Sequence, residues 1–329
     1  MKAAYYEKQG PAEDVLKIGE MADPQPGNGE VRIRIAASGI NPGDVKKRED
    51  TFGVGMTYER VIPHSDGAGV IDRVGKGVPE SRIGERCWCF GAQSYRPFGT
   101  AAEYTVVNAD QAIPLPSDVA FEQGACLGIP GITAHRALHV AGPIHGKTVL
   151  VQGGGGAVGS CAVALAKFGR ARVIATVRSD KDHAVATAAG ADDVLNTKGL
   201  PPEDVIKQLQ ALVPEGFHHV VEVAFHANIG IDEQVLAIDG SVAAYATENP
   251  EPAIPFWPLV FKNIRLFFIG SDDFPPAAKM AAAADLNAAL AAGWQGFEVA
   301  RTFTLDEIAD AHEFVETQSK RGRAVIVVS

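Results

Sequence analysis

The sequence has few cysteines, four in 329 residues. This number cannot supply the disulfide framework of a small secreted domain, and no pair shows C-x-x-C spacing. The N-terminal residues MKAAYYEKQGPAED also lack an apolar signal core. We therefore expect a cytoplasmic protein whose cysteines are reduced thiols, namely Cys87, Cys89, Cys126 and Cys161.

The sequence also lacks a basic run. Its 30 Lys and Arg residues are outnumbered by 40 Asp and Glu residues, which gives a net charge of −10. Because nucleic-acid phosphates and anionic lipids are both neutralised by clustered Lys and Arg, we expect neither a nucleic acid nor a membrane as partner.

The sequence also lacks a hydrophobic stretch that is long enough to span a membrane and is not interrupted by glycine. The stretch between Lys147 and Lys167 carries no charge and has about the length of a membrane span, but residues 153–156 at its centre are four glycines. Glycine favours neither a strand interior nor a helix interior. The stretch is therefore predicted to be a strand, a glycine turn and a buried helix.

Apolar patterning divides the chain into regions of different character. The first part contains short alternating strands such as Val31–Ser38, followed by a turn cluster at Asn41–Asp44. From Thr148 onward strands alternate with helices, which is typical of a doubly wound parallel sheet. The clearest of these elements are strands at 148–151, 172–177, 219–223, 241–246 and 263–269 and helices at 157–168, 180–189, 203–212 and 277–292.

This order predicts an α/β protein in which a β-rich domain is split by an inserted α/β domain. We place the first part of the β domain at 1–124, the α/β domain at 125–265, and the returning C-terminal part at 266–329. The later strands at 299–303 and 324–328 and a helix at 306–317 belong to that C-terminal part.

The most specific motif is Gly154-x-Gly156-x-x-Gly159, placed between a predicted strand and a predicted helix. In the dinucleotide fingerprint the first glycine permits a sharp turn, the second lets the backbone approach a pyrophosphate, and the third allows close helix–strand packing. The free N–H groups at the helix start then face the phosphates. The alternative interpretation is a glycine-rich turn without a ligand.

The end of the next predicted strand indicates which dinucleotide binds. The position that would hold a ribose 2′-hydroxyl through an acidic side chain is Val177. Arg178, Ser179 and Lys181 supply donors suited to a 2′-phosphate, and we interpret Asp180 as a helix N-cap. These residues favour NADPH over NADH, and the alternative is a solvated basic turn.

Several motifs together resemble one family. They are ASGINPGDVKKR at 37–48, P-x-x-D-G-A-G at 63–69, VGKGV at 74–78, GTAAEY at 99–104, PGITAHRAL at 130–138, AAGADDVLN at 188–196 and GRAVIVV at 322–328. With the glycine loop they resemble the zinc-independent medium-chain dehydrogenases/reductases, in the quinone oxidoreductase (zeta-crystallin-like) branch. The resemblance implies a GroES-like β domain around a Rossmann domain, with the active cleft between them.

The same resemblance implies a homodimer formed through Rossmann edge strands. The segment Asn263–Ile269 (NIRLFFI) is the natural candidate for that edge, although a buried core strand is the alternative.

Zinc-dependent relatives place a Cys where this chain has Asn41 and a His where it has Ser65. Neither Asn nor Ser is an ordinary zinc ligand, so we expect no metal. His64, next to the lost ligand position, is a candidate proton donor, a lone ligand or an ordinary cleft histidine.

The resemblance also assigns roles to individual residues. Asn41 and Thr133 would orient the nicotinamide, and Asp44 would fix the loop that carries Asn41 rather than transfer protons. Cofactor contacts are implied for Gly154, Gly156, Ala157, Val158, Gly159, Val223, Ala224, Ile269, Gly270 and Arg323. Relatives close the quinone site with tyrosines after this loop, where this chain has Lys46 and Phe52; Tyr58 and Arg60 are candidate substitutes. We expect His312 to be packed or hydrogen-bonded.

Without zinc nothing strongly electrophilic activates an alcohol. The remaining chemistry is hydride transfer from NADPH to an electron-poor acceptor, with the protein positioning the reactants and excluding water. We therefore predict an NADPH-dependent quinone reductase. The alternatives are a reductase of activated α,β-unsaturated carbonyl compounds and, from another class, a cofactor-binding protein without turnover.

Overall fold

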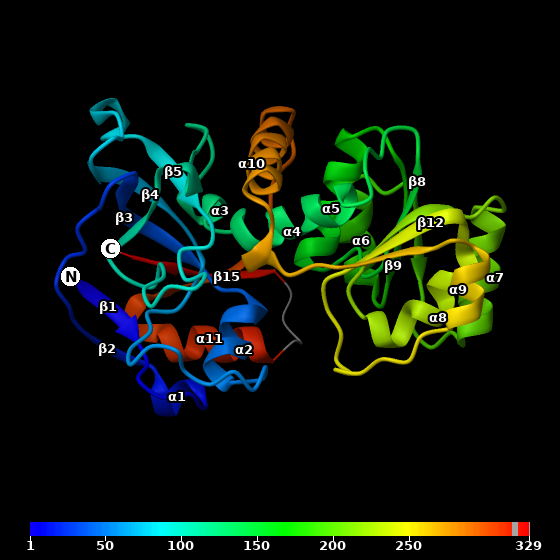
Figure 1. Cartoon of the computed structure of the whole chain (residues 1–329), viewed down its shortest axis with the longest axis horizontal. Coiled ribbons are helices and arrows are strands. Elements are labelled where there is room, and N and C mark those ends of the chain that lie inside the picture. The colour runs from blue at the N-terminus through cyan, green and yellow to red at the C-terminus, as the bar shows by residue number, and fades with distance from the viewer. Residues whose placement is uncertain (318–321, 329) are drawn as a thin grey trace. The chain divides into compact units, whose positions relative to one another are not determined.

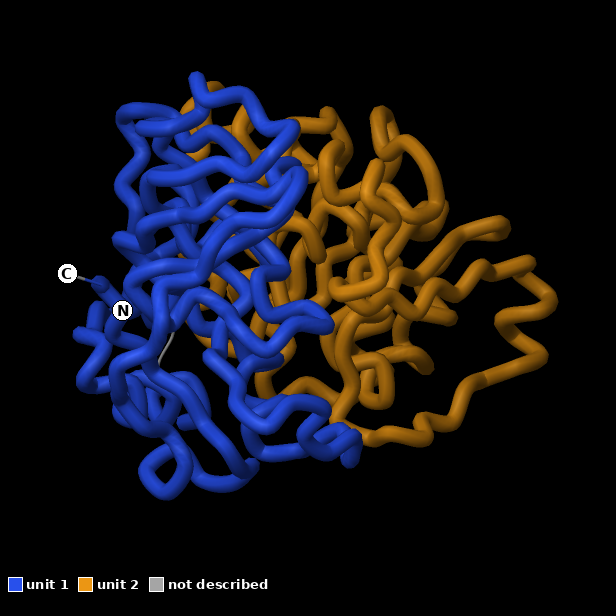
Figure 2. The backbone as a smooth tube through the Cα atoms, turned by 60° about the vertical axis from the view of Figure 1, so that its left-hand side comes forward, with its two compact units in different colours: residues 1–130, 295–329 blue, residues 131–294 orange. Residues whose placement is uncertain are grey.

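The computed structural model describes residues 1–317 and 322–328 and divides the chain into two compact units (Figure 2). Unit 1 consists of Met1–Pro130 and Gln295–Ser329, and unit 2 of Gly131–Trp294. We predicted a split first domain with a second domain inserted into it, and unit 1 is likewise made of two separate segments of the chain.

Unit 1 is built mainly on antiparallel strands, with one parallel pair between β14 and β15. Its main sheet has the order β14-β15-β3-β4-β5-β7, with β6 paired to β3, while β1 and β2 form a separate two-stranded sheet. The strands are β1 (Lys2–Tyr5), β2 (Lys17–Glu20), β3 (Glu30–Gly39), β4 (Asp66–Val74), β5 (Arg86–Cys89), β6 (Tyr104–Asn108), β7 (Ala112–Pro114), β14 (Val299–Thr304) and β15 (Arg323–Val327). The α-helices are α1 (Ala12–Val15), α2 (Pro42–Glu49), α3 (Phe121–Gly124) and α11 (Ile308–Glu316).

The central strand of unit 1 shows why this segment is a strand. Val31, Ile33 and Ile35 alternate along β3 and are buried in one cluster with Ile71 of β4. Because successive strand residues point to opposite faces, this alternation buries one face of the sheet. The C-terminal strand β15 then pairs antiparallel with the end of β3, so segments from the two ends of the chain lie side by side in one sheet.

Unit 2 is a six-stranded parallel sheet with the order β10-β9-β8-β11-β12-β13. Its strands are β8 (Thr148–Val151), β9 (Arg172–Val177), β10 (Asp193–Asn196), β11 (Phe217–Glu222), β12 (Leu236–Ala244) and β13 (Arg265–Phe268). Its helices are α5 (Ala157–Phe168), α6 (Asp180–Ala188), α7 (Pro202–Leu212), α8 (Phe225–Val235), α9 (Phe256–Phe261) and α10 (Pro276–Ala291), and α4 (Gly128–His139) leads into it. Numbered from β8, this order is 3-2-1-4-5-6, the doubly wound order that binds dinucleotides.

Both faces of this sheet are buried, as a parallel sheet requires. All four residues of β8 are buried, and Leu150 packs with Val205 and Leu209 of α7 in one hydrophobic cluster. Figure 1 shows helices on the two faces of the sheet. The predicted Rossmann-type architecture is therefore confirmed.

Three expectations need correction. The second domain boundary lies at 294/295 rather than at 265/266, because β13 pairs with β12 and α10 packs on α5, which keeps both in unit 2. The first boundary lies at 130/131 rather than at 124/125. Asn41–Asp44 is not an isolated turn but the start of α2.

A fourth correction concerns the cap of α6. Ser179, not Asp180, is the N-cap residue, because its side chain accepts a hydrogen bond from the Asp182 amide. Ser179 was expected to be a phosphate donor and Asp180 the cap.

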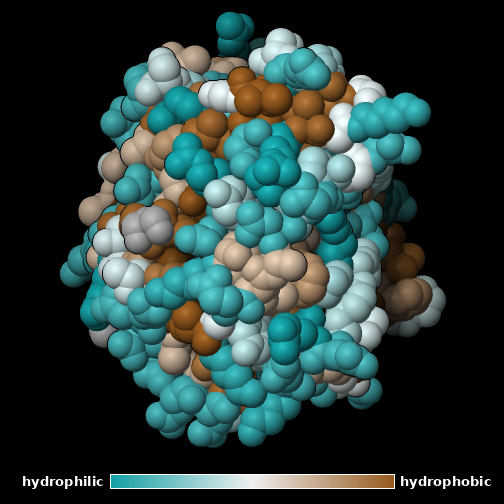
Figure 3. Space-filling model, turned by 90° about the vertical axis from the view of Figure 1, so that its left-hand side faces the viewer, coloured by the Kyte–Doolittle hydropathy of each residue, from teal (hydrophilic) through white to brown (hydrophobic). Residues whose placement is uncertain are grey.

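All four cysteines are buried free thiols, as predicted. Within residues 1–317 and 322–328, none of the helices combines the length and the apolar character needed to cross a bilayer. Seen from the left of Figure 1, the surface is mostly hydrophilic with scattered hydrophobic patches (Figure 3).

Candidate functional site

The glycine loop joins β8 to α5 in unit 2. Gly153 has a φ of +71°, a left-handed conformation that non-glycine residues rarely adopt. The sharp turn is therefore made at Gly153, one residue before Gly154, to which the motif had assigned it. The Gly154 amide then donates to the Thr176 carbonyl oxygen at 2.9 Å, which ties the loop to β9.

The other glycines of the motif are required by close packing. A Cβ on Gly159 would lie 2.2 Å from the Gly153 carbonyl oxygen, and one on Gly154 would lie 2.7 Å from the Ala175 Cβ. Neither distance is possible between non-bonded atoms. The helix and the loop can approach this closely only because both residues lack a side chain, as predicted for Gly159.

Gly156 differs from Gly154 and Gly159, because a side chain at this position would not clash with neighbouring atoms. It is the exposed N-cap of α5, and a Cβ there would come no closer than 3.5 Å to another atom, the Gly153 carbonyl oxygen. The first N–H groups of a helix, here those beginning at Ala157 and Val158, have no partner within the helix. With the positive end of the helix dipole they form an anion site, and the residues present fit a dinucleotide pyrophosphate.

The loop lies at the point where the strand order of the sheet reverses. β8 and β11 are parallel neighbours. The loop after β8 and Val223–Ala224 after β11 therefore lie at the same edge of the sheet, the one formed by the carboxyl ends of its strands. A Cβ on Gly153 would lie 2.9 Å from Val223 Cγ1, which shows how close the two segments are. Ile269 and Gly270 follow β13 at this edge, where the Ile269 amide donates to the Ala244 carbonyl oxygen at 3.0 Å. Ligands of open α/β sheets bind at such a switch point.

A buried polar network supports this edge from inside the sheet. Gln152 Nε2 donates to Asp232 Oδ1 at 2.8 Å, and Thr176 Oγ1 donates to Gln152 Oε1 at 2.5 Å. Glu222 accepts from the Ala224 amide and from Asn228 Nδ2. The network therefore connects the ends of β8, β9 and β11, where the candidate cofactor residues lie.

The carboxyl groups of Glu222 and Asp232 are both buried in this network. Burial raises the pKa of both Glu222 and Asp232, and the charge of Glu222 raises the pKa of Asp232 further. Because two adjacent carboxylates repel each other in a buried site, ionisation of one carboxyl group disfavours ionisation of the other.

The residues predicted to bind a 2′-phosphate follow β9. Arg178 and Lys181 are exposed, whereas Ser179 is half-buried and its hydroxyl donates to Asp182 Oδ2 at 2.9 Å while capping α6. Both cations therefore lie at the surface, and the Ser179 hydroxyl is already used.

Unit 1 contains a second buried network, centred on Asp66 at the start of β4. Asn41 Nδ2 donates to Asp66 Oδ2 at 2.7 Å, and Arg323 donates to Asn41 Oδ1 at 2.7 Å. The Ile129 amide also donates to the Asp66 carboxyl group, at 2.8 and 2.9 Å to its two oxygens. Both ends of the Asn41 amide are thus fixed, and one of its two N–H bonds remains for another acceptor.

The electrostatics of Asp66 follow from its position. Burial raises its pKa to about 7, against the opposing effect of the hydrogen bond from Asn41 and the charge of Arg323. Asp44 plays a different part: its carboxylate accepts from the Asn41 amide at 2.7 Å in a capping box at the start of α2. This geometry agrees with the expectation that Asp44 fixes the loop.

His64 is fully buried and has partners at both ring nitrogens. Ser38 Oγ lies 2.8 Å from its Nδ1, and the Nε2 of His312 lies 3.0 Å from its Nε2. Burial lowers the pKa of His64 to about 3, so the ring is neutral near pH 7. His312 is buried and hydrogen-bonded, as predicted.

The residues expected near the substrate are distributed over unit 1. Phe52 is 59% exposed, the Tyr58 hydroxyl donates to the Tyr95 carbonyl oxygen, and Arg60 is held by Glu7. Thr133 lies on α4 in unit 2 and is buried. Their predicted roles, like the shared role of Asn41 and Thr133, stay predictions.

The sequence analysis missed the buried polar residues whose hydrogen bonds support the candidate site. Asp66, Gln152, Glu222 and Asp232 were not proposed, although each is a buried polar residue. Glu222 and Gln152 both end apolar strand patterns, which was an available indication of a switch-point role. Asp66 entered only as the acidic residue of the P-x-x-D-G-A-G motif at 63–69.

Comparison with known proteins places these features in context. Residues 27–117 match the family described as "Alcohol dehydrogenase GroES-like domain" and residues 157–283 match "Zinc-binding dehydrogenase". The chain is 29% identical over 333 residues to the quinone oxidoreductase of Rattus norvegicus, covering 98% of this chain and 96% of that protein.

Two further relatives bear on the chemistry. The chain is 35% identical over 188 residues to the 2-methylene-furan-3-one reductase of Solanum lycopersicum, covering 55% of this chain and 48% of that protein. Its fold is similar to that of the Escherichia coli quinone oxidoreductase complexed with NADPH, with a TM-score of 0.85, 21% identity, and coverage of 99% and 100% of the two chains.

Proposed function

Because the chain belongs to the quinone oxidoreductase branch of the medium-chain dehydrogenase/reductase family, we propose that it transfers a hydride from NADPH to a quinone without a metal ion. The solved relative in complex with NADPH and the curated quinone oxidoreductases support this proposal.

The observation that carries the proposal is the open cradle at Gly156. The loop turns at Gly153, packs tightly at Gly159, and leaves the N-terminus of α5 exposed beside Gly156 at the switch point of the sheet. These residues would hold the pyrophosphate through backbone N–H groups.

The choice of NADPH depends on Arg178 and Lys181. Both side chains are exposed after β9, and Val177 provides no carboxylate that would hold a 2′-hydroxyl and repel a 2′-phosphate. The Ser179 hydroxyl contributes less than predicted, because it caps α6.

When bound, NADPH supplies the hydride, and the protein supplies position and a dry site. The amide of Asn41 is oriented by Asp66 and Arg323, so its free N–H can donate to a carbonyl oxygen of the acceptor. Asn41 and Ser65 replace the ligands of zinc-dependent relatives, and amide and hydroxyl groups are poor zinc ligands. The proposal gives His64 no proton-transfer role, because both its ring nitrogens have protein partners.

A second candidate function is reduction of an activated α,β-unsaturated carbonyl compound. The observation that favours it is the 35% identity to the 2-methylene-furan-3-one reductase of Solanum lycopersicum over half of the chain. The two activities need the same oriented carbonyl oxygen and differ in the carbon that receives the hydride.

We also propose a homodimer through the exposed edge of unit 2. β13 is the last strand of the sheet, and α9 beside it exposes Phe256, Trp257 and Phe261. Among the described residues no further strand pairs with the outer side of β13, and such a strand edge next to exposed aromatic residues is a typical surface for pairing with a second copy.

The test is a panel of acceptors with NADPH oxidation as the readout, using chelator-treated enzyme. We expect turnover with 1,4-benzoquinone or with an enone such as 2-methylene-furan-3-one, and none with saturated alcohols and NADP⁺. Faster turnover of the enone would select the second function. Absence of turnover with every acceptor, despite NADPH binding, would indicate a cofactor-binding protein instead.

A further inference from the structure

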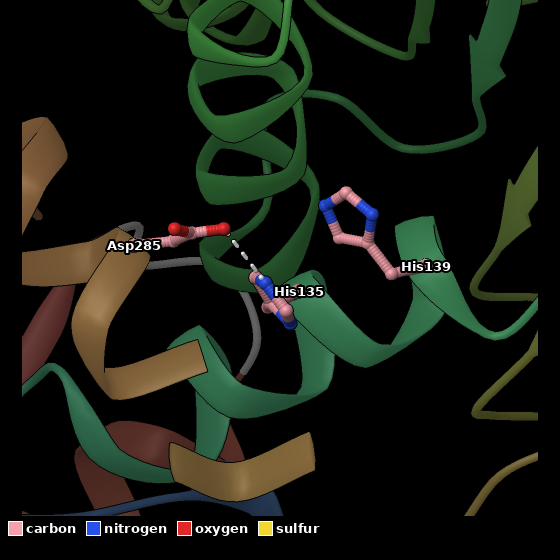
Figure 4. Close-up of side chains that lie close together, drawn as sticks. All are labelled: His135, His139 and Asp285. Carbon is pink, nitrogen blue, oxygen red and sulfur yellow. Dashed lines mark hydrogen bonds and ion pairs between the residues drawn. The ribbon is translucent and has the colours of Figure 1, made fainter. Parts of the chain in front are cut away.

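A group of three metal-binding side chains lies in unit 2, outside the proposed nucleotide site. His135 and His139 are four residues apart on α4, and Asp285 projects from α10 (Figure 4). The Nε2 of His135 lies 3.0 Å from Asp285 Oδ2, and the two imidazole centroids are 4.4 Å apart. One ligand atom from each residue lies within 4.8 Å of the others.

We propose that His135, His139 and Asp285 bind a divalent transition-metal ion, with Zn²⁺ as the matching ion. Two imidazoles and one carboxylate form a known type of zinc ligand set, and a fourth position then holds water. Zinc requires ligand distances of about 2.0–2.2 Å, so small side-chain rotations must bring the three ligand atoms around one centre.

The spacing on α4 supports coordination by both histidines. Residues at i and i+4 of a helix lie on the same face, and two histidines at this spacing bind zinc in helical metalloprotease motifs. The side chains in Figure 4 project from this face of α4 toward one region. A single backbone element therefore positions two of the three ligands before the ion binds.

The third ligand is brought close by the packing of α10 on α4. A Cβ on Gly131 of α4 would lie 2.7 Å from Leu286 Cδ1, so the absence of a side chain at Gly131 permits this approach. Leu286 follows Asp285 directly. The same close contact therefore places the Asp285 carboxylate against His135.

The burial of the three side chains also suits metal binding. His135 is buried, whereas His139 and Asp285 are partly exposed. The side chain of Asp285 is 47% exposed, which gives the ion a route from solvent.

The expected role of the ion is structural. Thr133 precedes His135 by two residues, so their side chains leave α4 about 200° apart at 3.6 residues per turn. The ion would join α4 to α10 and would not lie in the path of the hydride. Metal-free reduction of an acceptor and a zinc site here are therefore compatible.

The experiment uses the full chain without an affinity tag, freed of metal by a chelator. Co²⁺ is added first, because its visible absorption reports coordination geometry, and Zn²⁺ is then titrated by calorimetry. We expect one equivalent to bind, with a rise in the melting temperature and tetrahedral Co²⁺ bands. Absence of binding, or binding that raises no melting temperature and gives only octahedral Co²⁺ bands, contradicts the proposal.

Three variants locate the site. His139→Ala and Asp285→Asn should each weaken Zn²⁺ binding by on the order of 100-fold, since loss even of outer partners of a metal site costs about 10- to 100-fold. His145→Ala, at an exposed histidine of the same unit, is the matched control and should bind like the parent. Equal affinity in all four proteins would overturn the assignment. NADPH affinity should not change in any of them, which separates this result from a failure of the proposed function.

Discussion

Both units contain a buried polar network, but the groups that would face a ligand are formed differently in each. In unit 2 the candidate site is made by backbone at the edge of a parallel sheet, and space is kept open by glycines close together in the chain. In unit 1 it is made by side chains from distant parts of the chain, such as Asn41 and Arg323, joined through buried hydrogen bonds. Substitutions that add a side chain should therefore disturb ligand binding in unit 2. Substitutions that change a charge should disturb the stability of unit 1.

The largest expected effect concerns the charge of Asp66 in unit 1. Its folded-state pKa of about 7 lies above its reference value of 3.8, so the folded protein holds a proton that the unfolded chain releases between these values. Stability contributed by this group is present at low pH and is lost as pH rises through that window. Asp66→Asn mimics the protonated side chain and should remove this loss.

Urea unfolding of both proteins between about pH 4 and pH 8 measures this effect. The difference in unfolding free energy between parent and Asp66→Asn should change by on the order of 4 kcal/mol in favour of the variant as pH rises. The lowered pKa of His64 acts in the opposite direction in both proteins and cancels in the difference. Parallel pH profiles would show that Asp66 is ionised throughout.

The second effect tests added volume in unit 2. Gly156→Ala should fold normally, because the new Cβ meets nothing closer than 3.5 Å, but its methyl group would occupy the space next to the phosphates. We expect NADPH affinity to fall about 100-fold, which is about 2.7 kcal/mol. Gly230→Ala is the matched control, because it lies in α8 where a Cβ meets nothing within 4 Å. Unchanged NADPH binding by Gly156→Ala would place the phosphates elsewhere.

A third prediction uses the difference in apolar surface between the units. Phe261 of unit 2 is 76% exposed, and burying a phenylalanine contributes about 2 kcal/mol. Phe261→Ser should therefore weaken dimerisation in sedimentation equilibrium about 30-fold for each of the two copies of Phe261 that the dimer buries. Ile83→Ser, at a half-exposed apolar residue of unit 1, serves as the control and should leave the association constant unchanged.

The smallest effect concerns cofactor choice. Arg178→Ala removes one exposed cation and should weaken NADPH binding about tenfold while leaving NADH binding within about twofold. Lys207→Ala on α7, another exposed cation of unit 2, should change neither constant. A parallel loss of both nucleotides would mean that Arg178 does not read the 2′-phosphate.

The same contrast explains what could be predicted from the sequence. The boundaries of β8, α5 and β9 agree with prediction, because strand, glycine turn and helix are encoded within about 30 consecutive residues. The split of unit 1 around unit 2 was also predicted. The second boundary was placed too early because nothing local in NIRLFFI shows that it pairs with β12.

The networks behind the site could not be predicted in this way. Asn41 and Arg323 are 282 positions apart, and His64 and His312 are 248 apart, so only the folded chain shows that they are hydrogen-bonded. Periodicity identified these regions as strands and helices but carries no information on which buried polar groups meet. The prediction that Asp180 caps α6 was wrong, because the adjacent Ser179 is an equally good N-cap residue and the sequence does not distinguish the two.

Titration of the parent protein with NADPH and with NADH, followed by nucleotide fluorescence, tests the central claim most directly. The glycine cradle with Arg178 and Lys181 predicts that NADPH binds about tenfold more tightly than NADH. Equal affinity for the two nucleotides, or binding of neither, would contradict it.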